Sequence, residues 1–145
     1  MSHLVQRSAL LPHSARQMFD LVDEVERYAE FVPGVAAAVV HERSESVIVA
    51  SLTLQRAGVK FTLRTRNERH PFERLVMRLE DGPFRRFQAE WRFRQLGEMG
   101  SKVEFDAEFD LANVPFSGAA GMLLESVTGK LVDSFRVRAA QVYPA

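Results

Sequence analysis

From Val35 to Leu111, apolar side chains recur at every second position, and this pattern limits the possible folds more than any other feature of the sequence. Successive side chains of a β-strand point to opposite faces of its sheet, so a period of two predicts strands with one buried face. The segment FRRFQAEWRFRQL, residues 84–96, places Phe87, Trp91 and Phe93 together on one such face. The region therefore predicts an antiparallel sheet with a single apolar face, which another layer must cover.

Short segments rich in Gly, Pro, Asp and Ser divide this region into six predicted strands. Proline occurs at the breaks and in no predicted strand interior, as its missing N–H requires. Breaks this short favour hairpins between antiparallel neighbours over crossover connections. The predicted strands cover residues 35–43, 47–56, 59–69, 74–80, 85–96 and 102–111.

A further strand and two short helices are predicted before this region. Residues 3–11 alternate as a strand does, and a proline follows them. Ser14 is a predicted N-cap for a helix over residues 15–23. Asp23 is a predicted cap for a second short helix, residues 24–31, whose apolar residues recur at helical spacing.

Residues 117–143 predict one long C-terminal helix. Gly121 and Gly129 each cost about 1 kcal/mol of helix propensity relative to alanine, so either the helix bends there or its backbone comes close to another segment. The predicted apolar stripe consists of Ala120, Leu123, Leu124, Val127, Leu131, Phe135 and Val142.

This order of elements predicts a single α+β domain over residues 1–145, with a seven-stranded antiparallel sheet wrapped around the long helix. A chain of this size buries roughly 70% of its unfolded surface, which suffices for a core without disulfides. The N-terminal residues show no signal-peptide pattern, and no segment reaches the ~20 apolar residues of a membrane span. A cytoplasmic location is expected, with transient peripheral contact at the inner membrane as an open alternative.

The charge is balanced overall but unevenly spread. Residues 56–94 hold eleven Arg and Lys against five Asp and Glu, whereas the predicted strand 102–111 carries acidic side chains on its outward face. Cross-strand pairing of opposite charges is the interpretation that this alternation favours. The alternative is an electrostatic docking surface for anionic lipid or RNA, to which Arg64 and Arg92 would contribute. No DNA partner is predicted.

The sequence contains no motif for a metal site or a catalytic nucleophile. His3, His13, His41 and His70 are scattered and form no ligand trio with Asp or Glu. No glycine-rich phosphate loop follows a predicted strand, and no nucleophile elbow is present. We therefore predict no catalytic residue, no metal and no cofactor other than a bound lipid or quinone.

Three polar side chains share the inward direction of the apolar face. By alternation Arg85 points the same way as Phe87, and Thr65 and Asn67 point the same way as Phe61. Inside an apolar pocket such groups orient a polar head group, or they transfer a proton in a cyclase-type enzyme. The alternative is that they lie at strand ends, where the inward direction already faces solvent.

Three stretches of the chain together resemble one known family. MFDLVDEVERYAEFVPGV at 18–35, DGPFRRFQAEWRF at 81–93 and KLVDSFRVRAAQVY at 130–143 are similar to the polyketide cyclase / coenzyme Q-binding family of START-like proteins. The resemblance covers essentially the whole chain. It implies the helix-grip fold, with a cavity between sheet and long helix that takes a hydrophobic ligand. Two departures, Tyr28-Ala29 in place of Tyr-Pro and Gly34 in place of a bulky aromatic residue, lie at the expected mouth of that cavity.

The same resemblance implies three functions. In the coenzyme Q-binding branch, the protein binds a polyprenyl quinone such as ubiquinone and supports respiration without a known reaction. In the ribosome association toxin branch, the protein binds the large ribosomal subunit and blocks subunit association. The third function is that of a cyclase or aromatase enzyme.

Our leading prediction from the sequence is a non-enzymatic carrier of a hydrophobic small molecule, with a polyprenyl quinone as the expected ligand. It requires a cavity of about 300 Å³ or more between sheet and helix. Tyr28, Phe31 and Val32 are predicted to gate the cavity. Its predicted contacts are Phe61, Leu63, Met77, Phe87, Trp91, Phe93, Phe105, Met122, Leu123, Val127 and Phe135.

Overall fold

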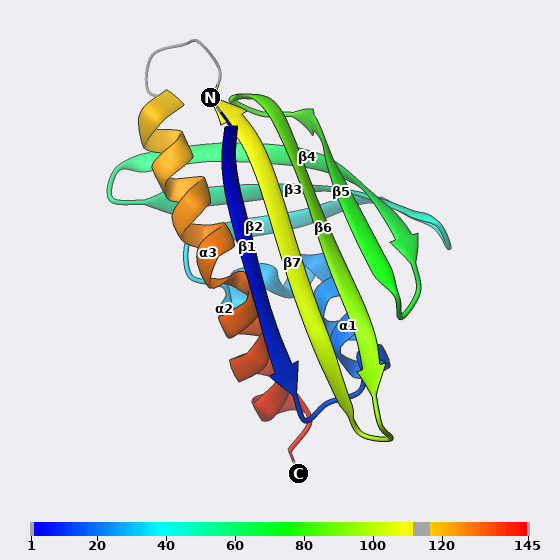
Figure 1. Ribbon diagram of the computed structural model, residues 1–145. Helices are drawn as coiled ribbons and strands as arrows, with labels where there is room; N and C mark the ends of the chain where they lie inside the picture. The colour runs from blue at the N-terminus through cyan, green and yellow to red at the C-terminus, as the bar shows by residue number, and fades with distance from the viewer. Residues whose placement is uncertain (1, 112–116, 145) are drawn as a thin grey trace.

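The elements follow one another along the chain in the predicted order (Figure 1). The structure, a computed structural model, describes residues 2–111 and 117–144. Each predicted boundary lies within two residues of the observed one, except that the second short helix is divided into a 3-10 turn and a single α-helical turn. The elements are β1 (Ser2–Leu11), α1 (Ala15–Asp23), η1 (Val25–Arg27), α2 (Tyr28–Phe31), β2 (Val35–Arg43), β3 (Val47–Arg56), β4 (Val59–His70), β5 (Arg74–Asp81), β6 (Phe84–Leu96), β7 (Gly100–Leu111) and α3 (Ser117–Val142).

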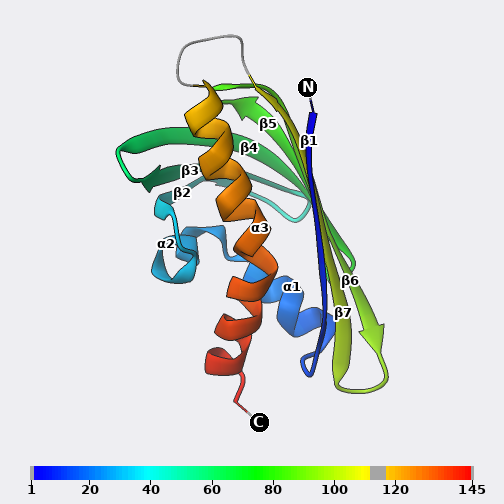
Figure 2. The same ribbon diagram turned by 60° about the vertical axis from the view of Figure 1, so that its left-hand side comes forward.

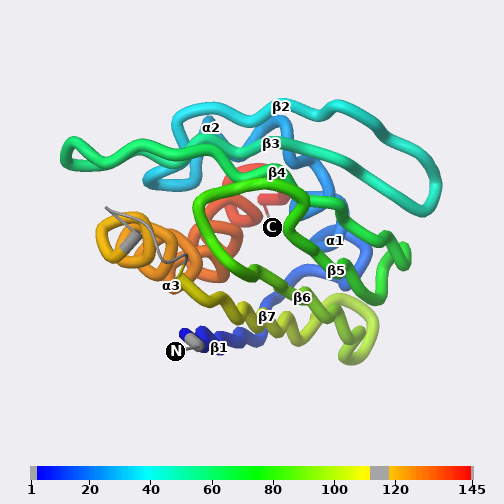
Figure 3. The backbone as a smooth tube through the Cα atoms, turned by 90° about the horizontal axis from the view of Figure 1, so that it is seen from above, coloured from blue at the N-terminus to red at the C-terminus, as the bar shows by residue number. Residues whose placement is uncertain are grey.

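The strands form one seven-stranded sheet in the order β1-β7-β6-β5-β4-β3-β2, and every neighbouring pair is antiparallel. The sheet curls so strongly that it forms two facing limbs (Figure 3). One limb consists of β2, β3 and β4, and the other of β1, β7 and β6. Helix α3 lies between these limbs, and α1 and α2 lie near its C-terminal half (Figure 2). The predicted α+β architecture, a sheet wrapped around the long helix, is confirmed.

Aromatic rings pack against one another between the sheet and α3. Trp91 and Phe105 point inward from β6 and β7, with ring centroids 4.6 Å apart. Phe135 of α3 meets the Trp91 ring edge-on at 5.3 Å. All three side chains are almost fully buried. Rings in such edge-to-face contacts leave few voids, because the packing approaches that of an organic crystal.

The first short helix begins as predicted and the second does not. The Ser14 hydroxyl accepts a hydrogen bond from the Gln17 N–H, and the Gln17 side chain accepts one from the Ser14 N–H, which completes a capping box. The predicted capping role of Asp23 is wrong, because Glu24 occupies the cap position of η1 and makes no side-chain capping bond. The Asp23 carboxylate pairs instead with the guanidinium of Arg69.

The glycines of α3 mark places where its backbone closely approaches the sheet, which was one of the two predicted alternatives. A Cβ at Gly121 would lie 2.5 Å from Cδ2 of Leu111 at the end of β7. Near Gly129, the Arg7 side chain of β1 donates a hydrogen bond from Nε to the Gly129 carbonyl at 3.2 Å. The helix can therefore press against one edge of the sheet only where side chains are absent.

The outward face of the sheet is crossed by ion pairs, as the alternation predicted. Arg86 of β6 pairs with Glu108 of β7, and Arg64 of β4 pairs with Glu80 of β5 at 3.1 Å. Exposed pairs of this kind contribute about 0–1 kcal/mol each, so their main effect is to favour one strand register.

Candidate functional site

The predicted ligand cavity exists as a small enclosed space between the sheet and α3. Its volume is about 30 Å³, and no polar surface is accessible in it. Seven of the predicted apolar contacts and one of the predicted polar groups form its wall. These are Tyr28, Leu63, Met77, Phe87, Trp91, Phe105 and Val127, together with Thr65.

A volume of about 30 Å³ is far below what a quinone requires. Sites for drug-sized ligands measure roughly 300–1,000 Å³, whereas about 10–15 Å³ suffices for one water molecule. In this structure the predicted cavity between sheet and helix is therefore almost filled by side chains. A polyprenyl ligand could enter only if the wall residues moved.

The predicted gate is closed by contacts with α1 and α3. The Tyr28 hydroxyl is buried and donates a hydrogen bond to the Val22 carbonyl. Burial, followed by the nearby carboxylates of Asp23 and Glu26, raises the pKa of Tyr28 far above its ordinary value. Tyr28 therefore stays neutral at any physiological pH, and its hydroxyl remains a donor that fixes the ring in place.

Helix α2, which contains both Tyr28 and Phe31, is held in place by packing and by charge. The Phe31 ring lies edge-on to Phe135, with centroids 5.1 Å apart, and the Arg138 guanidinium lies 4.8 Å from the Phe31 ring centroid. Arg138 also pairs with Glu30 at 3.0 Å. Val32, the third predicted gate residue, is buried. These contacts hold α2 against the C-terminal half of α3.

Two of the three predicted polar groups face the interior. Thr65 and Asn67 of β4 are 2% and 0% exposed, so the alternative that they face solvent at a strand end is wrong. The Thr65 hydroxyl donates to Oδ1 of Asn67 at 2.9 Å, and Nδ2 of Asn67 has no partner among the described residues. A buried unpaired donor costs about 1–3 kcal/mol, so the Asn67 amide is an unfavourable polar group within the apolar interior.

The third polar prediction, Arg85, is wrong because the strand alternation breaks beside it. The β6–β7 ladder shifts register between Phe84 and Arg86, which is the mark of a β-bulge. Phe84 and Phe87 are both buried, and Arg85 lies between them with its side chain exposed. Counting every second residue cannot detect a bulge, since the inserted residue reverses the parity of everything before it.

Met122 is also placed wrongly by the sequence prediction. Its side chain is 75% exposed, whereas its neighbour Leu123 is buried. Adjacent residues of a helix point about 100° apart, so a narrow buried stripe that includes Leu123 excludes Met122. The remaining predicted contacts pack next to the cavity wall without forming part of it: Phe61, Phe93, Leu123 and Phe135.

Six wall residues were not predicted as cavity contacts. Most carried a usable signal: Leu52 and Leu54 share the inward parity of β3, and Leu124 and Leu131 belong to the predicted helix stripe. For Thr128, the one indication in the sequence was its position one helical turn after Leu124. The complete set is Val35, Leu52, Leu54, Leu124, Thr128 and Leu131.

Gly34 fixes the close approach between the start of β2 and α3, and its replacement tests that contact. Its φ is +93°, and an added Cβ would lie 2.7 Å from Cγ2 of Val127. Gly58, with φ +84° and no atom within 4 Å of its Cβ position, shares the backbone strain without the clash. We expect Gly34→Ala to lower the free energy of unfolding by about 1–3 kcal/mol more than Gly58→Ala does, as measured by urea denaturation. Equal losses would contradict close packing at Gly34.

Within residues 2–111 and 117–144, no group of three His, Asp or Glu side chains is arranged to hold a metal ion. None of the helices in this part of the chain is both long and apolar enough to span a membrane. The candidate site is therefore a small apolar interior with one buried polar pair, surrounded by a charged outer surface.

Residues 11–136 match the model of a protein family described as polyketide cyclase / dehydrase and lipid transport. The chain belongs to this family. The ribosome association toxin RatA of Pseudomonas aeruginosa is 41% identical to it over 143 residues, which cover 99% of each chain. RatA of Escherichia coli K12 is 33% identical over 141 residues, which cover 97% of this chain and 89% of that relative. The family resemblance inferred from the sequence is confirmed.

A solved member of the same structural class supports the fold assignment. The Zhui aromatase/cyclase from Streptomyces sp. R1128 superposes with a TM-score of 0.83, covering 99% of this chain and 98% of that chain at 19% identity. The predicted START-like helix-grip fold is therefore confirmed. At this level of identity the likeness concerns the fold alone, because one fold hosts many chemistries.

Proposed function

We propose that this chain is a non-enzymatic ribosome-binding toxin, which binds the large ribosomal subunit and blocks subunit association. The observation that carries the proposal is the 41% identity, over 99% of the chain, with a protein named ribosome association toxin. The small interior agrees with this proposal, because a cavity of about 30 Å³ is too small for a large ligand and a macromolecular partner would bind the outer surface.

The outward side of β4 is the best candidate for a surface that contacts ribosomal RNA. Lys60, Arg64 and Arg66 point outward there, with Thr62 between the first two, and we call these three cations the β4 row. Arg64 is paired with Glu80, whereas Lys60 and Arg66 have no acidic partner in the described part of the chain. The β3 positions that pair with the row are uncharged. Unpaired cations attract the phosphate backbone, so Lys60 and Arg66 are the residues of the row that carry the proposal.

Arg92, which the sequence also suggested as a docking residue, lies in a different environment. Its guanidinium bonds Glu90 at 2.8 Å, Asp106 at 2.8 Å and Glu104 at 3.4 Å. These hydrogen bonds, the one that Arg92 donates to Glu90 first, raise the pKa of Arg92 above its ordinary value. A cation that is already neutralised by three carboxylates has little attraction left for a polyanion, so the proposal rests on the β4 row.

Charge reversal in the β4 row tests the proposal. We expect Lys60→Glu with Arg66→Glu to weaken co-sedimentation with purified large subunits about tenfold or more, because each lost phosphate contact reduces both affinity and its salt dependence. The matched control is Arg94→Glu with Lys102→Glu, an equal charge change on β6 and β7. If wild-type protein does not sediment with large subunits at low salt, the ribosome proposal is wrong. If both double variants bind large subunits equally well, the β4 row is not the surface that contacts the ribosome.

A second candidate function is binding of a hydrophobic small molecule, with a polyprenyl quinone as the expected ligand. It is supported by the lipid transport description of the family and by the buried Thr65–Asn67 pair, in which Thr65 lines the cavity and Nδ2 of Asn67 has no partner among the described residues. It requires the wall to open well beyond about 30 Å³. Native mass spectrometry of protein purified without detergent tests it, since a consistent lack of any bound quinone or lipid argues against this function.

A further inference from the structure

A second hollow, separate from the interior cavity, lies between the β3–β4 hairpin and α3. The tip of this hairpin extends beside the N-terminal half of the helix (Figure 2). The groove measures about 440 Å³, which falls within the roughly 300–1,000 Å³ of small-molecule sites. It shares no residue with the cavity wall. Its lining is Arg56, Ala57, Val59, Ala119, Met122, Leu123, Ser126 and Lys130.

The charges of this groove are all of one sign. Arg56 enters it from the end of β3 and Lys130 from α3, and none of the lining residues is acidic. The Arg56 guanidinium donates a hydrogen bond from Nη1 to the Ser126 hydroxyl at 3.3 Å, which holds it beside the helix. Neither cation forms an ion pair within residues 2–111 and 117–144. Two unneutralised cations on facing elements are suited to one carboxylate or phosphate group.

The remainder of the groove is apolar. Val59 and Leu123 are part of its lining, and Met122 is 75% exposed, the second most exposed of the large hydrophobic side chains in the described chain. An unbranched, polarizable methionine adapts to differently shaped apolar partners, and its exposure costs free energy in water. The groove thus combines a cationic end with an apolar surface.

We propose that this groove binds a single amphiphilic anion, with its carboxylate or phosphate head between Arg56 and Lys130 and its apolar chain along Val59, Met122 and Leu123. The site is independent of the β4 row, and it can be occupied while the interior cavity stays closed. The charge and the apolar surface are both required, so neither a bare anion nor a cationic amphiphile binds with comparable affinity.

The methyl group of Met122 reports directly on occupancy. Protein labelled with ¹³C at the methionine methyls is titrated with monomeric dodecyl phosphate, below its micelle concentration. We expect the Met122 methyl resonance to shift in a saturable manner, while that of Met99, which is 76% exposed elsewhere, stays in place. Inorganic phosphate and dodecyltrimethylammonium serve as the head-only and charge-reversed probes. Equal shifts at Met99 and Met122, or saturation by either control probe at the same concentration, would overturn the proposal.

Neutral variants separate the two halves of the site. Arg56→Gln and Lys130→Gln are each expected to weaken dodecyl phosphate binding about tenfold or more, because each removes a charge-assisted contact. Lys102→Gln on β7 makes the same charge change away from the groove and is expected to bind as wild type does. The protein could also float with phosphatidylglycerol vesicles but fail to bind monomeric dodecyl phosphate. This result would mean adsorption to membranes and would refute the single-amphiphile site. Ribosome co-sedimentation of Arg56→Gln is expected to remain unchanged, so failure here is distinct from failure of the proposed function.

Discussion

Replacing Asp23 with alanine is expected to lower the free energy of unfolding by about 3–5 kcal/mol, because it leaves a mostly buried guanidinium without its counter-ion. The Asp23 and Arg69 side chains are only 12% and 16% exposed. Two parallel hydrogen bonds join them, from Nε at 2.8 Å and from Nη2 at 2.7 Å. The hydrogen bonds that Arg69 donates to Asp23 raise the pKa of Arg69 in the wild-type protein. Without Asp23 the guanidinium still cannot relieve the loss by releasing its proton, because arginine does not deprotonate in proteins.

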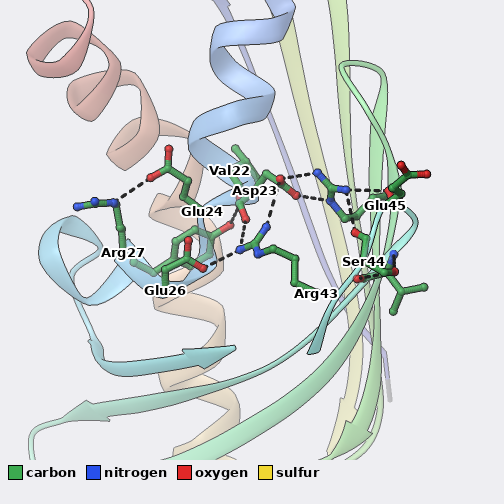
Figure 4. A network of polar contacts seen from close by, with 11 residues as sticks. Val22, Asp23, Glu24, Glu26, Arg27, Arg43, Ser44 and Glu45 are labelled. Atoms are coloured by element: carbon green, nitrogen blue, oxygen red, sulfur yellow. Dashed lines mark hydrogen bonds and ion pairs between the residues drawn. The ribbon is translucent and has the colours of Figure 1, made fainter. Parts of the chain in front are cut away.

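The large expected effect follows from how many segments meet at this carboxylate (Figure 4). Arg69 of β4 also donates to the carbonyls of Ser44 and Glu45 in the β2–β3 turn. Arg43 bonds the Asp23 carbonyl at 3.3 Å and the Glu26 carboxylate at 2.7 Å. The network thus ties the junction of α1 and η1 to the sheet, and loss of Asp23 would loosen the segment that carries the gate.

A matched control uses an ion pair that joins no distant segments. Arg136 and Asp133 lie one turn apart on α3, and both are more than half exposed. Asp133→Ala is expected to change the free energy of unfolding by less than about 1 kcal/mol. Urea denaturation followed by fluorescence of the one tryptophan measures both variants. If Asp23→Ala costs no more than Asp133→Ala, the network does not hold the fold together.

The Asp23 network also shows which features a sequence can predict. A strand period or a capping box involves residues a few positions apart, so local pattern predicted most element boundaries and the cap at Ser14. Asp23 lies 20 residues from Arg43 and 46 from Arg69. The residues next to Asp23 do not show whether its carboxylate caps a helix or pairs with a distant arginine, because a carboxylate can do either. The role of Asp23 is evident only in the folded structure, where Arg43 of β2 and Arg69 of β4 lie beside the end of α1.

The candidate site was harder to predict for the same reason. Alternation correctly indicated that Thr65 and Trp91 point inward, because direction is set by the backbone alone. It failed at Arg85, where a bulge depends on how β6 pairs with β7. It also could not give the free volume, which depends on how rings from four elements interlock. A list of large inward side chains therefore fits both an open pocket and the nearly filled interior observed here.

Phe135→Ala is the second substitution with a large expected effect, because the Phe135 ring is the central contact between α3, the gate and the sheet. Its centroid lies 5.1 Å from that of Phe31, 5.2 Å from that of Tyr28 and 5.3 Å from that of Trp91. Removing a buried phenyl group costs about 3–5 kcal/mol, through lost transfer free energy and the cavity left behind. Val137→Ala, on the same helix but 43% exposed, is expected to cost less than about 1 kcal/mol.

The same variant distinguishes a rigid interior from one that can open. If the surrounding rings keep their places, Phe135→Ala leaves a dry apolar cavity beside the existing one, and a small apolar probe such as benzene should raise its melting temperature in a saturable manner. The melting temperatures of wild type and Val137→Ala should not respond to benzene. If Phe135→Ala loses the expected stability but binds no benzene, α2 and α3 have collapsed into the vacated space. Collapse would mean that the gate moves easily, which is the property that a quinone-binding interior needs and a ribosome-binding surface does not.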